Sequence, residues 1–339
     1  MNDIIIITIL SFLSSVFFHL LSKKIFTKLN VFVLINERSS HYGKPTSSGG
    51  IALFLAMFTT TLYFYFSTTT QLYDYSILLP LSLLFIIGFY DDIEDADFKF
   101  KFLIQLIAAK LIIDQGFVID LFYLFDGRVS MNYFIAQLFT GFIIVAIINS
   151  INFIDGLDGL AISFGLFILG SITLLTNNNP LFYFNLIIII ALIPGLYFNY
   201  KNQKKVFLGD SGSLLLGGII AINILSLLEP GVKINYDLDP NKFLLSGLLM
   251  FYPAMDLIRL FSGRALKGGS PFIADKSHLH HILNQVIQSH IKSVLLIIFI
   301  CLINLFTGLF VWYYLGEYYL LFYILLSYSL SVIFIKSKA

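Results

Sequence analysis

Eleven apolar runs, each close to the length of a helix that crosses a bilayer, follow one another through the chain. They lie near residues 3–21, 49–67, 75–90, 102–113, 133–149, 159–176, 181–198, 212–228, 242–258, 293–314 and 317–335. Crossing about 30 Å of hydrocarbon takes roughly 20 helical residues, and small errors at the boundaries bring the shorter runs near that length. A backbone in hydrocarbon must satisfy its own hydrogen bonds, which a helix does. We therefore predict an all-α polytopic membrane protein with about eleven transmembrane helices.

The composition supports this prediction and excludes other classes. With 58% hydrophobic and 12% charged residues, the chain is too apolar for an ordinary soluble protein. A net charge of +1 gives no basic surface for nucleic acid. The first run lacks the flanking signals of a removable signal peptide, so we expect it to be retained as a span. Nothing divides residues 1–339, which we expect to form one membrane domain, and Asp126-Gly127 within 115–132 predicts a small hairpin outside the membrane.

The distribution of positive charge predicts the orientation of the chain. Of the 21 Lys and Arg residues, 17 fall in one set of alternate loops, and the other set holds only Arg128, Lys233 and Lys242. Because positive loops stay in the cytoplasm, the amino terminus should lie outside and the carboxyl terminus inside. Five loops rich in polar residues fall on the predicted cytoplasmic side, at 36–50, 91–101, 149–160, 199–213 and 256–290. This convergence predicts a cytoplasmic active site or an inner vestibule.

The loop at 149–160 is the most unusual of the five. It places four polar residues between two long apolar runs, namely Asn149, Asn152, Asp155 and Asp158. A polar helix cap would need only one of them, and such groups are costly near a membrane without partners. Gly156 and Gly159 would leave backbone N–H groups open to a ligand. We interpret this loop as part of a site.

Two further loops carry carboxylates at the ends of spans. Asp91 and Asp92 abut the third run, where adjacent carboxylates share a cation or raise each other's pKa. The following Glu94, Asp95 and Asp97 are typical of a solvated loop. Asp210 stands between glycines at a predicted helix start, where it would repel a phosphate unless a cation lay between them. Magnesium suits this arrangement, and a simple N-cap is the alternative.

The last predicted inner loop is basic. It gathers Arg264, Lys267, Lys276, His278, His280 and His281, a set that suits a diphosphate. Zinc is the competing explanation for the histidines, but no cysteine accompanies them, and the adjacent His280 and His281 cannot easily face one metal on a regular helix. The first inner loop adds Arg38, His41 and Lys44 before Gly49-Gly50.

Taken together, these motifs resemble those of the polyprenyl-phosphate N-acetylhexosamine-1-phosphate transferases of glycosyltransferase family 4. The resemblance covers nearly the whole chain, through Asp91-Asp92, the repeat at 149–159, Phe-Leu-Gly-Asp-Ser-Gly-Ser at 207–213, and Ser-Pro-Phe followed by His-Leu-His-His at 270–281. His-Leu-His-His is similar to the bacterial branch that starts O-antigen, common-antigen or teichoic-acid linkage units. The branch that transfers phospho-N-acetylmuramoyl-pentapeptide usually carries three consecutive histidines, and Leu279 interrupts them here. Ser47-Ser48 departs from the family's first loop and leaves the choice of amino sugar open.

The resemblance implies transfer of an N-acetylhexosamine 1-phosphate, with GlcNAc expected, from a UDP-sugar to undecaprenyl phosphate, with release of UMP. This would be the first membrane step of a cell-envelope polysaccharide, at the cytoplasmic face of the bacterial inner membrane. The implied partners are UDP-N-acetylhexosamine, undecaprenyl phosphate, the lipid bilayer and a second copy of the chain as a homodimer, but no nucleic acid.

The same resemblance implies roles for individual residues. Asp91 is the residue expected to activate the lipid phosphate, as base or as nucleophile, with Asp92 in support; Asn152 and Asp210 would bind Mg²⁺, or Mn²⁺ in its place. The expected substrate-binding residues are Lys44, Asn149, Asp155, Asp158, Asn199, Phe207, Arg264, His278, His280 and His281. A phosphate monoester has a second pKa of about 6 and is largely dianionic at neutral pH, so we favour direct attack.

Two other classes of function share some of these features. A transporter for a nucleotide sugar or another organic anion also carries intramembrane charges and glycine-broken helices. It needs a polar path to the outer face, however, and the predicted spans are nearly uncharged. A non-catalytic lipid-binding scaffold would not need Asp91, Asp92 and Asp210 together.

Overall fold

The computed structural model describes residues 2–32, 45–67, 71–124, 127–201, 205–234, 241–266 and 278–338. Its helices are α1 (Asn2–Lys28), α2 (Gly49–Ser67), the short 3₁₀ helix η1 (Tyr75–Ile77), α3 (Leu78–Glu94), α4 (Phe98–Asp114), α5 (Tyr133–Ile154), α6 (Leu160–Leu175), α7 (Phe182–Tyr200), α8 (Gly209–Leu228), α9 (Lys242–Leu249), α10 (Phe251–Leu266), α11 (Leu279–Ile287), α12 (His290–Leu315) and α13 (Glu317–Lys338). The strands are β1 (Leu121–Leu124), β2 (Gly127–Ser130), β3 (Thr176–Asn177) and β4 (Lys233–Ile234). The all-α fold is confirmed, and each of the eleven predicted runs is helical.

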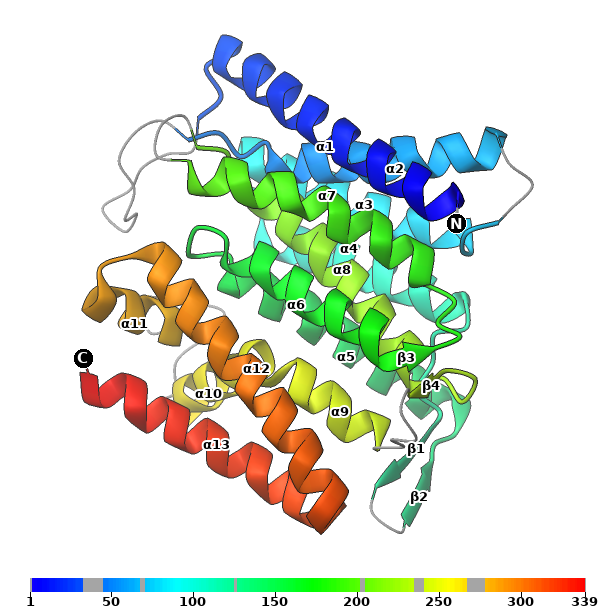
Figure 1. The fold of residues 1–339 in the computed structure, drawn as a ribbon, viewed down its shortest axis with the longest axis vertical. Helices are drawn as coiled ribbons and strands as arrows, with labels where there is room; N and C mark the ends of the chain where they lie inside the picture. The colour runs from blue at the N-terminus through cyan, green and yellow to red at the C-terminus, as the bar shows by residue number, and fades with distance from the viewer. Residues whose placement is uncertain are drawn as a thin grey trace.

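The lengths of these helices refine the predicted spans. Within the described residues, eight helices are long and apolar enough to cross a membrane, or nine if α9 and α10 form one span. The remaining two predicted spans are α4, with 17 residues, and α6, with 16. The two termini lie at opposite ends of the helical bundle (Figure 1), as an odd number of passes requires.

Two details of the fold differ from the sequence prediction. The run at 242–258 is bent by 79° between α9 and α10. Pro253 explains the break, since its ring clashes with the carbonyl of Leu249, the last residue of α9. The second difference is α11, a short helix within the predicted loop at 256–290, which buries Leu279, His280 and Leu283.

The core is organised around α8. All seventeen residues from 211 to 227 are buried, and α2, α3, α5 and α6 pack against this helix. A helix that is apolar on every side is stable only when protein covers it on every side. Any group at an end of α8 is therefore held by most of the bundle.

The ends of α8 mark the two ends of the molecule. At its carboxyl end, β4 pairs with β3, which follows α6, so the ends of α6 and α8 lie together. The predicted hairpin is present as β1 and β2, with Leu121 opposite Ser130, near the same end of the bundle (Figure 1). At the other end of α8, the end of α3 meets the start of α8, and three polar loops gather there.

The contact between α3 and α8 gives a prediction about stability. A Cβ on Gly88 would lie 2.3 Å from the carbonyl oxygen of Asp210, whereas a Cβ on Gly170, also inside a helix, would meet nothing within 4 Å. Gly88→Ala should therefore lower the free energy of unfolding by about 1–3 kcal/mol, because the helices must separate. Gly170→Ala should be neutral or slightly stabilising, because alanine favours the helix. Reversible unfolding in mixed detergent micelles measures both values, and equal stability of the two variants would contradict the described packing.

Candidate active site

The end of α3 is fastened to the start of α8 by Asp92. Its carboxylate accepts hydrogen bonds from the backbone N–H groups of Asp210, at 2.9 Å, and Ser211, at 3.0 Å. Asp92 therefore serves as the N-terminal cap of α8, supplied from another helix. The sequence suggested that this helix start could attract a phosphate, but these two N–H groups already have a partner.

A lysine joins Asp91 to Asp210. Lys101 Nζ lies 2.7 Å from Asp91 Oδ2 and 2.7 Å from Asp210 Oδ2. The other Asp91 oxygen accepts a hydrogen bond from the Ala96 N–H at 2.9 Å. Sequence reasoning counted Lys101 only as one of the positive loop residues and missed this role. Its place one turn into α4, directly after the acidic loop, was the available signal.

Asn152, at the end of α5, reaches the same point. Its Nδ2 donates to Ser213 Oγ at 2.8 Å, and Ser213 Oγ donates in turn to the backbone carbonyl of Asp210 at 3.5 Å. The predicted metal ligands Asn152 and Asp210 are therefore neighbours, and Asp91 is connected to them through Lys101. These groups come from four helices, and all lie at the polar end of the bundle.

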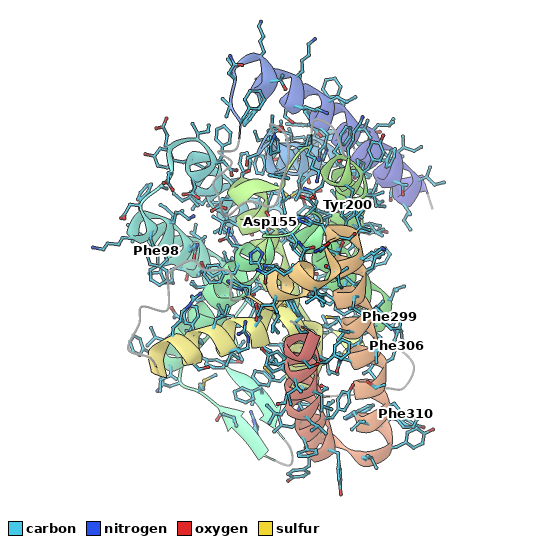
Figure 2. The ribbon with its side chains drawn as sticks, turned by 90° about the vertical axis from the view of Figure 1, so that its left-hand side faces the viewer. Phe98, Asp155, Tyr200, Phe299, Phe306 and Phe310 are labelled. Carbon is cyan, nitrogen blue, oxygen red and sulfur yellow. The ribbon has the colours of Figure 1, made fainter. Side chains whose placement is uncertain are left out.

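Asp155 follows one turn after Asn152 and lies on the face shown in Figure 2. No hydrogen bond or ion pair to its carboxylate is found among the described residues. Burial raises the pKa of Asp155 well above its usual range, and the charges of Asp210, Asp92 and Asp158 raise it further. This corner of the site has more carboxylates than cations.

Asp158 has partners. Its buried carboxylate lies 2.5 Å from Lys205 Nζ and 3.1 Å from His290 Nδ1, so it ties the loop before α8 to the start of α12. The sequence suggested that Gly156 and Gly159 leave room for a ligand. At Gly159, where φ is +77°, a Cβ would lie 2.4 Å from Tyr200 Cζ, so a protein side chain takes that space.

Three other predicted substrate-binding residues have clear structural contacts. Asn149 Nδ2 donates to Gln105 Oε1 at 2.6 Å, which joins α5 to α4. Asn199 is buried and donates to the Val206 carbonyl at 3.0 Å. Phe207 is held through its backbone, since its N–H donates to the Thr46 carbonyl and its own carbonyl accepts from the Gly49 N–H, each at 2.9 Å. The first loop therefore lies against the loop that leads to Asp210.

The histidine segment lies against the loop that carries Asp155. An ideal Cβ on Gly156 would be 2.9 Å from His280 Nε2 and equally close to His281 Nε2. Their ring centroids are 4.3 Å apart, and both nitrogens approach Gly156. His280 Nε2 is buried without a hydrogen-bond partner among the described residues, and burial lowers the pKa of His280 well below its usual range, with His281, His278 and Arg259 adding to the effect.

Two residues of α10 contact the ring nitrogens of the histidines. Tyr252 hydroxyl lies 3.2 Å from His280 Nδ1, and Asp256 Oδ2 lies 2.9 Å from His278 Nδ1. Ligand atoms of Asp256, His278 and His280 fall within 4.8 Å of one another, as a metal site would need. Sequence reasoning did not single out either α10 residue, because both stand within an apolar run.

Of the last two predicted substrate-binding residues, Arg264 lies within the described part of the chain and Lys44 does not. Arg264 is in the last turn of α10, with its side chain partly buried. Lys44 lies outside the described residues, as do the loop residues 267–277 that complete the basic motif.

Comparison with known proteins gives a consistent result. Residues 74–228 match the model of the family described as Glycosyl transferase family 4. The chain is 31% identical over 287 residues to decaprenyl-phosphate N-acetylglucosaminephosphotransferase of Mycobacterium leprae, which covers 77% of this chain and 72% of that protein. It is 30% identical over 302 residues to the probable undecaprenyl-phosphate N-acetylglucosaminyl 1-phosphate transferase of Bacillus subtilis, covering 88% and 82% of the two chains. For undecaprenyl-phosphate alpha-N-acetylglucosaminyl 1-phosphate transferase of Escherichia coli the identity is 28% over 283 residues, covering 80% and 74%. The chain belongs to glycosyl transferase family 4, the family of the polyprenyl-phosphate N-acetylhexosamine-1-phosphate transferases.

Proposed function

We propose that this protein transfers N-acetylglucosamine 1-phosphate from UDP-GlcNAc to undecaprenyl phosphate and releases UMP. The observation that carries the proposal is the group of Asp91, Asp155 and Asp210, which lies at one end of the bundle beside the histidine segment. Phosphoryl transfer depends on positioning and on neutralising charge, and this arrangement supplies acidic and basic groups together. The names of the relatives support the choice of a polyprenyl phosphate acceptor and of N-acetylglucosamine.

Magnesium is the proposed cofactor, and manganese could replace it. Asp210 and Asn152 both contact Ser213, and the unpaired Asp155 follows one turn after Asn152; their carboxylate and amide oxygens suit a hard cation. Asp91 and Asp210 share the ammonium of Lys101, and no ion pair to Asp92 or Asp155 is found among the described residues. A divalent cation would balance this charge and, when bound, would draw electron density from the donor phosphates.

Asp91 and Asp92 would have different roles at the acceptor, undecaprenyl phosphate. Asp92 holds the start of α8 and so fixes the place of Asp210. Asp91, held by Lys101 and the Ala96 N–H, would orient the lipid phosphate and accept its proton where one remains. Because the monoester is largely dianionic near neutral pH, direct attack on the donor needs no stronger base.

The donor would lie over the loop at 155–159. His280 and His281 converge beside Gly156, and with His278, Arg264 and Lys44 they would hold its phosphates. Phe207 would stack on the uracil, with Asn149 and Asn199 supporting the loops around it. Asp155 has a carboxylate available for the nucleotide, whereas Asp158 would act mainly by fixing the loop through Lys205 and His290.

The proposed setting is the bacterial inner membrane, with the site in the cytoplasm, the amino terminus outside and the carboxyl terminus inside. The excess of Lys and Arg on one set of loops supports this orientation. A water-soluble nucleotide sugar and a lipid phosphate could then meet at one face. No relative reported above is named as a transporter, and none as a muramoyl-pentapeptide transferase.

Purified protein given UDP-GlcNAc, undecaprenyl phosphate and magnesium tests the proposal. We expect UMP to be released in step with a lipid-linked product, and neither to form without the lipid or with magnesium chelated. Exchange of UDP-GlcNAc across proteoliposomes without UMP release would instead favour a transporter.

Asp210→Asn should lower kcat by at least about 100-fold, because a metal-binding oxygen of the site loses its charge. The variant should still insert in the membrane, since the Asp92 cap uses only the backbone N–H of residue 210. Asp97→Asn is the control, because Asp97 is exposed in the acidic loop between α3 and α4 and makes no side-chain cap bond. Near-normal turnover of Asp210→Asn at ordinary magnesium concentration would remove Asp210 from the metal site.

Lys101→Met should also lower kcat by about 100-fold or more, since Asp91 and Asp210 would lose the ammonium that lies between them. Lys99→Met is the control, because it makes the same substitution at an exposed position of α4. Its kcat should be nearly normal. Steady-state kinetics with both substrates provides the comparison. Equal activities for the two variants would mean that the Lys101 contacts have no part in turnover.

The role of Asp91 can be decided without the lipid. If Asp91 were a nucleophile, enzyme and UDP-GlcNAc alone would form a phosphosugar adduct and release UMP in an amount equal to the enzyme. We expect no such burst, and a small residual activity of Asp91→Asn that rises with pH as the lipid phosphate ionises unaided. Quenched-flow measurement of UMP answers the question. A stoichiometric burst with label trapped on Asp91 would refute direct attack.

A further inference from the structure

We propose that Asp256 is a positioning residue of the active site, which orients His278 through Nδ1 so that Nε2 is left to accept a hydrogen bond from the nucleotide-sugar donor. This inference deepens the proposed function and rests on it. Asp256 stands in α10, and the sequence pattern indicated no role for it beyond marking the start of the polar loop at 256–290. Its side chain is 1% exposed, so it would act through the residues that it contacts.

Every oxygen of the Asp256 carboxylate has a partner. Oδ1 accepts from Arg259 Nη2 at 2.6 Å and Nε at 3.1 Å, and from the Leu279 N–H at 3.4 Å. Oδ2 lies 2.9 Å from His278 Nδ1. Arg259 offsets the charge that would otherwise make a buried carboxylate so unfavourable. Asp256 therefore joins α10 to the first residues of α11.

The contact with Asp256 determines which ring nitrogen of His278 carries the proton. An ionised carboxylate can only accept a hydrogen bond, so Nδ1 carries a proton and Nε2, on the far side of the ring, remains for a ligand. A ring nitrogen without a proton accepts hydrogen bonds, so Nε2 would accept one from a hydroxyl group of the UDP-sugar. The His278 side chain keeps 11% exposure, so the ring is not sealed off.

A second residue of α10 contacts the Nδ1 atom of His280. Tyr252, one helical turn before Asp256, contacts His280 Nδ1 at 3.2 Å, while His280 Nε2 is buried beside Gly156 without a partner among the described residues. Two histidines thus have Nδ1 occupied by α10. A buried ring nitrogen without a partner is costly, and a phosphate oxygen from the donor would satisfy it.

Asp256→Asn separates this role from simple packing. Asparagine keeps the shape, but its amide offers only one acceptor oxygen to Arg259 and His278 together. Either Arg259 or His278 Nδ1 then faces the N–H group of the asparagine amide. Where His278 faces it, Nδ1 must act as the acceptor, so the tautomer with the proton on Nε2 is favoured. We expect the dissociation constant of UDP-GlcNAc, measured by calorimetry with magnesium present, to rise about 10-fold or more. In turnover, the loss should fall mainly on KM for the donor.

A double-mutant cycle tests whether Asp256 acts through His278. In the His278→Ala background, Asp256→Asn should change donor affinity less than about 2-fold, because the ring to be oriented is gone. His278→Asn keeps a donor for Asp256 but lacks Nε2, so it should lose affinity while staying folded, and it serves if Asp256→Asn is not recovered. Asp114→Asn, at the exposed Lys110 pair, is the matched control and should bind normally.

The outcomes separate this inference from the proposed function. Donor binding is measured without the lipid acceptor, so a failure of UMP release would refute the proposed reaction and leave the binding cycle readable. Additive effects of Asp256→Asn and His278→Ala, or normal donor affinity in either His278→Asn or Asp256→Asn, would overturn the positioning role. One zinc per chain in active protein, lost with Asp256→Asn, would also overturn it, since Asp256, His278 and His280 would then be metal ligands.

Discussion

The attachment of Asp92 to the first N–H groups of α8 is the contact on which the rest of the site depends. A helix covered by protein on every side cannot leave its terminal N–H groups to water, and a carboxylate from α3 satisfies two of them. Because Asp91 is the neighbour of Asp92, the same contact brings Asp91 near Asp210. A residue with no expected contact to substrate therefore sets the position of two that are expected to react with it or hold its metal.

Charge then decides what this arrangement is suited to bind. Asp91 and Asp210 share Lys101, and Asp158 has Lys205 and His290, but Asp155 has no partner among the described residues, and burial raises its pKa. The histidines on the other side of Gly156 contribute ring nitrogens near the same place. A cation for the carboxylates and phosphates for the histidines would complete both halves, and a metal-bound diphosphate brings the two together.

Much of this could be predicted from sequence, for identifiable reasons. Apolar runs report span positions directly, and alternating loops place distant motifs at one end of the bundle, as the contacts of Asp92 and Asn152 confirm. Lys101 was hidden among positive loop residues, because charge counting cannot distinguish a solvated lysine from a paired one. Asp256 was hidden in an apolar run, because only three-dimensional packing brings α10 behind α11. The break at Pro253 had a visible signal, whereas the space beside Gly159 could be assigned to Tyr200 only from the structure.

The central claim is that a sugar phosphate, and not the sugar alone, passes to the lipid. UDP-GlcNAc carrying radioactive phosphorus only in its β-phosphate tests this most directly, with purified protein, undecaprenyl phosphate and magnesium. The account predicts that the label moves into the organic phase with the lipid in step with UMP release, because the bond between the two donor phosphates breaks. Label that remains in water as UDP while the sugar reaches the lipid would show that the other bond breaks, and would contradict the account.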